Sequence, residues 1–203
     1  QLHRMIGVTY KTAWFMAHRI REAMNEPNPG PIGGPGESVQ ADETYFGTKD
    51  ALRGKTWAEK KGHSKKMSVI TLVSKGKSRT FHVDTANSTA IREILLRNVD
   101  KETALHTDES RLYKRVGKEF AVHESVHHAA GEYYRGGVHT NCAENYFSIF
   151  KRGMRGVYQH CTEKHLQRYL TEFDFRYNSR EISDFERAEM AHKGAEGKRL
   201  RYK

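Results

Sequence analysis

The sequence predicts an α/β fold in which a mixed sheet is flanked by helices. Three β-rich segments occupy the first part of the core region, and a segment with apolar residues at helical spacing follows them. Short strand patterns then alternate with further helical patterns. Strands interrupted by a connecting helix are typical of α/β proteins with a mixed sheet.

The N-terminal segment, residues 1–26, predicts a pair of helices. Apolar residues precede Gly7, and Thr9 is placed to cap a second helix over residues 10–24. Helix, glycine turn and helix are the parts of a helix-turn-helix DNA reader, here a partial one. Its candidate DNA contacts are Lys11 and Arg19. Any helical hairpin shows the same pattern, so that alternative stays open.

A linker and three strands follow. Residues 27–37 are rich in Pro and Gly, which predicts a linker. Residues 37–47 alternate and carry β-branched and aromatic side chains, which predicts a strand that holds Asp42. Residues 66–74 and 77–84 are β-rich runs separated by two residues, the pattern of a hairpin. Together they predict a three-stranded antiparallel meander.

The second half of the core delivers another acidic residue. A crossover helix, capped by Ser88 or Thr89, leads into a short strand that places Asp108 at its C-terminal tip. Open α/β sheets place their active sites at such tips. The predicted elements are a helix at 88–97, a strand at 103–108, a helix at 112–116, a strand at 120–122, helices at 140–152 and 163–178, and a charged C-terminal tail at 181–203 that frays from Glu186.

The helix at 140–152 carries the third candidate acid, Glu144. Apolar residues recur there at i, i+4 and i+7, and Thr140 or Asn141 is placed to cap the N-terminus. Gly153 is expected to loosen or end the helix.

Asp42, Asp108 and Glu144 are the candidate catalytic and metal-binding residues. Phosphodiester chemistry needs an activated water and a stabilised leaving oxygen, and two divalent ions about 3.5 to 4 Å apart supply both. Mg²⁺ prefers oxygen ligands and keeps several waters, so a few carboxylates suffice. Three acids without a cation would repel one another. The alternative is a set of ordinary surface acids, because a chain with 25 acidic residues always offers some trio.

Charge points to a polyanionic partner. The chain has 35 Lys and Arg against 25 Asp and Glu, a net charge of +10 and a pI near 9.6. Lys151 follows Glu144 by two helical turns, so it is placed to hold a phosphate beside the acids. Arg152 and Arg155 extend this candidate DNA-binding surface. A solvated helix end that complements the helix dipole is the alternative.

Three blocks of the sequence resemble the catalytic blocks of bacterial insertion-sequence transposases, the ISXO2-like branch related to the Merlin elements. The blocks are residues 41–47 (ADETYFG), 106–110 (HTDES) and 139–160 (HTNCAENYFSIFKRGMRGVYQH). The resemblance spans about residues 1 to 180. It implies a DDE-type transposase with a ribonuclease H-like catalytic domain at 38–180, which cleaves DNA at insertion-sequence ends and transfers the strand.

The resemblance also implies roles for single residues. Asp42 and Asp108 correspond to the first two metal ligands and Glu144 to the third. Some members of this branch carry Asn as the third catalytic residue, and Asn141 lies three residues before Glu144 on the same helical face. A neutral amide binds a divalent ion more weakly than a carboxylate, which favours Glu144. Asn141 then serves as a second ligand, a water-positioning group or a helix cap.

The implied cofactor is Mg²⁺ or Mn²⁺, with two ions. The implied partners are double-stranded DNA, as transposon ends and target, and further copies of the chain, as a homodimer or larger assembly on DNA. Family members carry a zinc ribbon ahead of the helix-turn-helix, so we expect this chain to be a fragment. Two alternatives remain: a ribonuclease H-like nuclease without strand joining, and a DNA-binding remnant without activity.

Other features bound the environment. Two cysteines without a paired motif argue against a zinc site and favour a reducing cytoplasm. The resemblance implies that this is a bacterial cytoplasm, with association to the nucleoid. No apolar run reaches the roughly 18 residues that a membrane span requires, so we expect no membrane partner. Residues 50–65, which include Trp57, lack apolar periodicity and predict an inserted loop that tracks a DNA backbone.

Overall fold

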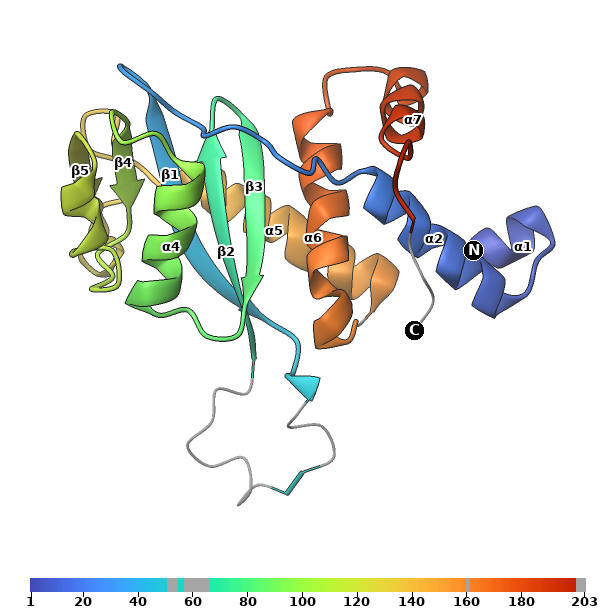
Figure 1. Ribbon diagram of the computed structural model, residues 1–203. Coiled ribbons are helices and arrows are strands. Elements are labelled where there is room, and N and C mark those ends of the chain that lie inside the picture. The colour runs from blue at the N-terminus through green and yellow to red at the C-terminus, as the bar shows by residue number, and fades with distance from the viewer. Residues whose placement is uncertain (51–54, 57–65, 160, 200–203) are drawn as a thin grey trace. The chain divides into compact units, whose positions relative to one another are not determined.

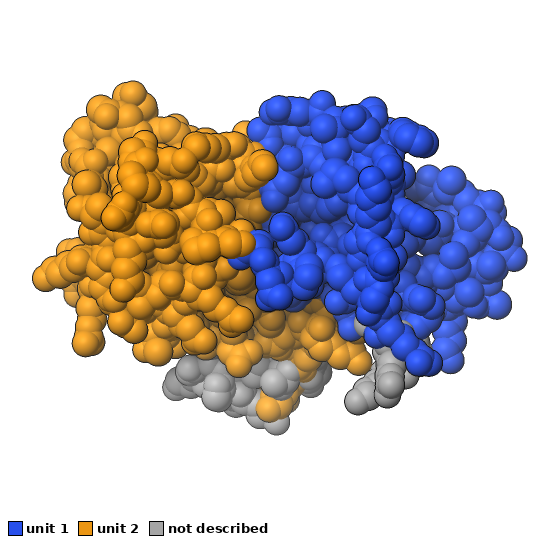
Figure 2. Space-filling model, turned by 45° about the horizontal axis from the view of Figure 1, so that its top comes forward, with its two compact units in different colours: residues 1–29, 167–203 blue, residues 30–166 orange. Residues whose placement is uncertain are grey.

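The structure is a computed structural model of the 203-residue chain, and it describes residues 1–50, 55–56, 66–159 and 161–199. The chain divides into two compact units, which Figure 2 colours separately. We call Gly30–Leu166 the sheet unit, and Gln1–Pro29 with Gln167–Lys203 the helical unit. Most of the predicted inserted loop, including Trp57, lies outside the described residues.

Within the described residues, the sheet unit holds a five-stranded mixed sheet in the order β3-β2-β1-β4-β5. The first three strands pair antiparallel, whereas β4 pairs parallel with β1 and β5 pairs parallel with β4. The strands are β1 (Ser38–Phe46), β2 (Met67–Ser74), β3 (Lys77–Val83), β4 (Ala104–Thr107) and β5 (Val122–Ser125). This is the ribonuclease H-like arrangement, so the predicted fold class is confirmed.

The antiparallel part forms as the sequence predicts. All residues of β2 are buried, in keeping with its central place between β1 and β3. The β2–β3 turn uses Lys75 and Gly76 with φ of 47° and 69°, and two positive φ values suit the right-handed twist of a tight hairpin. The bounds of the three strands lie within one residue of those predicted.

Helix α4 (Ser88–Asn98) crosses from β3 to β4 and packs on one face of the sheet. Its fully buried Ile91 and Leu95 share a core with Val39 of β1 and Leu105 of β4. We call this side of the sheet the α4 face.

The predicted cap of α4 is wrong by one residue. Asn87, in extended conformation, holds the N-cap position, and its side chain accepts a hydrogen bond from the Ala90 backbone N at 2.9 Å. Ser88 lies inside the helix. An Asn at this position bonds to the N–H three residues on, as Ser or Thr would, so residue type alone did not fix the start.

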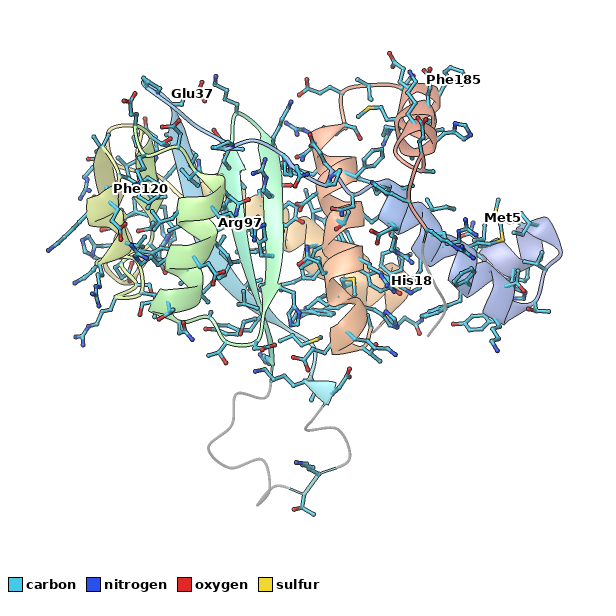
Figure 3. The ribbon with its side chains drawn as sticks, in the orientation of Figure 1. Met5, His18, Glu37, Arg97, Phe120 and Phe185 are labelled. Atoms are coloured by element: carbon cyan, nitrogen blue, oxygen red, sulfur yellow. The ribbon has the colours of Figure 1, made fainter. Side chains whose placement is uncertain are left out.

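The segment between β4 and β5 also differs from the prediction. The α-helix expected at 112–116 is a run of turns, followed by the 3₁₀ helix η2 (Val116–Glu119). The last strand begins at Val122, two residues later than expected, because Phe120 turns into the core of the α4 face instead of joining a strand (Figure 3).

Helix α5 (Asn141–Gly153) covers the opposite face of the sheet, which we call the α5 face (Figure 1). A short 3₁₀ helix, η3 (His128–Ala130), lies in the connection that precedes it. The α-helical hydrogen bonding ends at Gly153 as predicted, and a π-helical turn, η4 (Met154–Tyr158), continues the chain.

The helical unit contains α1 (Leu2–Ile6), α2 (Tyr10–Ala23), the part of α6 (Glu163–Asn178) from Gln167 onward, and α7 (Asp184–Lys193). Gly7 ends α1 with φ of 68°, and the Thr9 side chain caps α2 by accepting from the Thr12 backbone N at 3.2 Å. The two predicted helices therefore form, and their role in reading DNA stays a prediction.

The C-terminal segment is more ordered than the sequence suggested. The frayed end predicted from Glu186 is wrong for α7, because Ser183 and Glu186 form a reciprocal capping box that starts this helix. Among the helices that the structure describes, none has both the length and the apolar character needed to cross a membrane.

Candidate active site

The alternation of β1 assigns Asp42 to the α5 face. Gln40, two residues earlier, accepts a hydrogen bond from the Cys142 backbone N of α5 through its Oε1 at 3.0 Å. Phe46 contacts Phe150 of α5, with ring centroids 5.3 Å apart. Because alternate residues of a strand share a face, the side chain of Asp42 also points to the α5 side.

The parallel pairing of β1 with β4 brings Asp108 beside Asp42. Gln40 pairs with His106, and each aspartate follows its paired residue by two positions. Neighbouring strands lie about 4.8 Å apart, so continuing this register puts the two carboxylates side by side on one face. Asp108 stands just past the end of β4, where its Oδ1 accepts from the Ser110 backbone N at 3.0 Å.

Glu144 enters from the first turn of α5, where negative charge complements the helix dipole. Its side chain is 47 % exposed. His128 Nε2 lies 3.4 Å from Glu144 Oε1 and 3.0 Å from Thr140 Oγ1. The connection between β5 and α5 therefore supplies a polar neighbour to the glutamate.

The three acids share one electrostatic environment. The pKa of Asp42 is raised from 3.8 to about 7, mainly by burial and next by the charge of Asp108, with smaller contributions from Glu43 and Glu144. The Glu43 backbone N–H, which donates to Asp42 Oδ1 at 2.7 Å, lowers this pKa in part. Burial also raises the pKa of Asp108. A cation would relieve the repulsion that these shifts reflect.

The donor chemistry fits a hard divalent ion, because all three candidate groups are carboxylates. In the described part of the chain, however, no group of three or more His, Cys, Asp or Glu residues is placed so that it could hold one metal ion. The half-exposed Glu144 is the member with the most freedom to move toward the aspartates.

The side-chain cap predicted for the N-terminus of α5 does not form in the structure. Thr140 takes the N-cap position, but its side chain makes no capping bond and instead contacts His128. Asn141 is the first helical residue, and its side chain is exposed. A free N–H of the first turn is instead bound by Gln40 of β1, so the sheet itself holds this end of the helix.

Lys151 lies in the last turn of α5. Its pKa is lowered, chiefly by burial and by Arg155, while the charge of Asp42 raises it. Arg152 and Arg155 are exposed beside it. Lys11 and Arg19 are exposed on α2, which belongs to the helical unit.

The sequence analysis missed three neighbours of the acids: Gln40, Glu43 and His128. Glu43 was overlooked because it points to the α4 face, where a charged side chain is unexpected; there its Oε2 accepts a hydrogen bond from the Tyr113 hydroxyl at 2.6 Å. Gln40 and His128 act through contacts distant in sequence, which no local pattern reveals.

Comparison with known proteins gives a family match over most of the chain. Residues 34–178 match the family described as ISXO2-like transposase domain. No match was found among curated proteins.

Solved structures of viral integration proteins are also similar to this chain. A chain of the simian T-cell lymphotropic virus intasome, solved in complex with PP2A regulatory subunit B56 gamma, has 14% identity and a TM-score of 0.46, covering 93% of this chain and 69% of that one. The HTLV-2 integrase catalytic core domain in complex with magnesium, in its trimeric form, has 11% identity and a TM-score of 0.41, covering 78% and 98%.

Proposed function

The chain belongs to the ISXO2-like transposase domain family, and we propose that it is a DDE-type transposase that cleaves and rejoins DNA at insertion-sequence ends. The observation that carries this proposal is the half-buried Asp42, whose pKa of about 7 reflects loss of solvation together with the charges of Asp108, Glu43 and Glu144. Holding these carboxylates close together raises the free energy of the folded protein, which is expected mainly where their charge serves a function.

Asp42, Asp108 and Glu144 would hold two divalent metal ions, Mg²⁺ or Mn²⁺. When bound, the ions would help to activate the attacking oxygen and to stabilise the leaving oxygen. Binding requires Asp42 to lose its proton and the half-exposed Glu144 to approach the aspartates. Asn141, exposed on the first turn of α5, is then free to position a water or to act as a further ligand.

The reaction has two steps at one site. First, a water oxygen attacks the phosphorus at the transposon end, the bond from phosphorus to the 3′ oxygen breaks, and the strand is released with a 3′ hydroxyl. Next, that hydroxyl attacks a phosphodiester of the target, a new P–O bond forms, and the target strand is released with its own 3′ hydroxyl. The proton of each attacking group passes to solvent.

Basic residues would hold the DNA during both steps. Lys151, whose pKa the charge of Asp42 raises, would bind a phosphate next to the reacting one. Arg152 and Arg155 would extend the contact along the backbone, and Lys11 and Arg19 of α2 would bind the transposon end. We expect the active form to be a dimer or larger assembly on paired DNA ends.

The test is a reaction with a labelled duplex that carries the element's end, with and without Mg²⁺ or Mn²⁺. The proposal predicts metal-dependent nicking that leaves a 3′ hydroxyl, followed by products joined to target DNA. Nicking without joined products would favour a ribonuclease H-like nuclease. Duplex binding without any nicking would favour a DNA-binding remnant.

A further inference from the structure

Glu43 is a carboxylate next to the site that the proposed reaction does not use. It follows Asp42 on β1, and its side chain points to the α4 face. Its Oε2 accepts a hydrogen bond from the hydroxyl of Tyr113 at 2.6 Å, and the backbone N–H of Tyr113 donates to the Ser110 carbonyl oxygen at 3.3 Å. Tyr113 is fully buried in the core of the α4 face, so it holds Glu43 from a fixed position.

Through these bonds, Glu43 connects the two aspartates. The backbone N–H of Glu43 donates to Asp42 Oδ1 at 2.7 Å. The backbone N–H of Ser110 donates to Asp108 Oδ1 at 3.0 Å, and the Ser110 carbonyl oxygen accepts from the backbone N–H of Tyr113, whose hydroxyl donates to Glu43. Glu43 therefore contacts Asp42 with its backbone and, through Tyr113, contacts the turn that carries Asp108 with its side chain.

The connection matters because Asp108 lies beyond the paired part of β4. The parallel ladder with β1 ends at His106, and the strand itself ends at Thr107. The next residues form turns, in which the Leu112 backbone N donates weakly to Ser110 Oγ at 3.4 Å. On the β5 side the Val126 backbone N donates to the Thr107 carbonyl oxygen at 3.1 Å, and on the β1 side the bond from the Tyr113 hydroxyl to Glu43 ties this turn to the sheet.

We propose that Glu43 is a positioning residue that, together with Ser110 and Tyr113, fixes the separation and orientation of Asp42 and Asp108 for binding a divalent cation. The inference rests on the proposed function, because it assumes that the two aspartates bind a metal. Outer partners of metal ligands commonly change metal affinity about 10- to 100-fold when they are removed.

The test measures Mn²⁺ binding directly by electron paramagnetic resonance, without DNA and independently of catalysis. Three variants weaken or break the link: Tyr113→Phe removes the hydroxyl donor, Glu43→Gln replaces the charged acceptor with a neutral one, and Glu43→Ala removes the acceptor. Two controls match them. Glu37→Gln changes a glutamate where β1 begins, paired there with Lys75 (Figure 3), and Tyr146→Phe changes a buried tyrosine of the same unit.

We expect the Kd for Mn²⁺ to rise about tenfold in Tyr113→Phe and Glu43→Gln and further in Glu43→Ala, with both controls within twofold of wild type. The double variant Glu43→Gln/Tyr113→Phe should lose no more affinity than Glu43→Ala, because both changes break one link. Thermal unfolding is measured for each variant, and Tyr113→Phe and Glu43→Gln carry the test if Glu43→Ala does not fold.

Any of the following results would overturn the inference. A lowered unfolding temperature with an unchanged Kd would show that the link is only structural. An equal loss in Glu43→Gln and Glu43→Ala, with wild-type affinity in Tyr113→Phe, would make Glu43 a ligand itself. Wild type that binds Mn²⁺ and nicks DNA while all variants match it refutes this inference alone, whereas wild type that neither binds Mn²⁺ nor nicks DNA refutes the proposed function as well.

Discussion

The two faces of β1 carry alternate residues of one strand and differ in the environment that those residues meet. On the α4 face, Val39 and Ala41 are fully buried among apolar side chains. On the α5 face, Gln40 and Asp42 meet the polar first turn of α5 and the neighbouring carboxylates. One nine-residue strand thus supplies core packing on one side, where Glu43 is the charged exception, and charge on the other.

The comparison indicates that stability and the proposed function depend on different residues. Side chains of the α4 face lower the free energy of the folded state by burial. The carboxylates of the α5 face raise it, because burial and mutual repulsion oppose their charged forms. Changes to the apolar core residues of the α4 face should therefore cost stability, while changes to the carboxylates of the α5 face should cost metal binding and can increase stability.

The largest effect on folding is expected at Leu105, which is fully buried on β4. Leu105→Ala should lower the free energy of unfolding by about 2–5 kcal/mol, measured by urea denaturation, because it leaves a cavity in the core. The Mn²⁺ affinity of the molecules that remain folded should stay within twofold of wild type. A large loss of affinity in this variant would mean that the two faces are not separable.

The opposite sign is expected at Asp42. Its folded-state pKa of about 7 lies above its ordinary value of 3.8, so its contribution to stability is fully present below pH 3.8 and is lost as the pH rises through 7. In metal-free buffer at pH 8, Asp42→Asn should raise the free energy of unfolding by at most about 4 kcal/mol.

Urea denaturation at pH 8 and at pH 5 checks this prediction, with Glu102→Gln, an exposed acid near β4, as the control. The gain should shrink at the lower pH. If Asp42→Asn is no more stable than wild type at pH 8, the charged form of Asp42 does not lower the free energy of unfolding, which contradicts its raised pKa.

A smaller effect concerns pH and metal affinity. Because protons compete with the cation for Asp42, the Mn²⁺ affinity should fall about tenfold, or about 1.4 kcal/mol, for each pH unit below 7. Above pH 8 it should level off. Mn²⁺ titrations at pH 6, 7 and 8 measure this slope, and an affinity that does not change over this range would contradict a raised pKa at Asp42.

The smallest effect is expected at Lys151. Lys151→Ala should weaken DNA binding by about 1 kcal/mol and reduce the slope of log affinity against log salt by about 1, the loss of one phosphate contact. Fluorescence anisotropy at several salt concentrations gives both values. Lys118→Ala, on the exposed surface of η2, is the control, and an identical salt slope in the two variants would remove Lys151 from the DNA contact.

The elements that the sequence predicted well are those with strong local patterns. The hairpin of β2 and β3 was predicted within one residue, because uninterrupted β-rich runs flank a two-residue turn. The segment at 112–120 was not, because Tyr113 and Phe120 are fixed by the core they enter and not by a local period. Tertiary packing decides such short segments.

The candidate site divides in the same way. Asp42, Asp108 and Glu144 were identified because each stands in a distinctive motif at the end or middle of a predictable element. The link from Glu43 to Tyr113 spans 70 positions, and the bond from Cys142 to Gln40 spans 102. Such contacts depend on strand register and helix placement, which the sequence pattern alone does not contain.

The most direct test of the charged face compares wild type with Asp108→Ala, Glu144→Ala and Asn141→Ala in Mg²⁺- or Mn²⁺-dependent nicking of the labelled transposon end. We predict that the first two variants lose at least about a thousandfold in rate, near 4 kcal/mol, and that Asn141→Ala keeps its activity. Loss in Asn141→Ala with activity retained in Glu144→Ala would contradict the carboxylate trio and make Asn141 the third ligand.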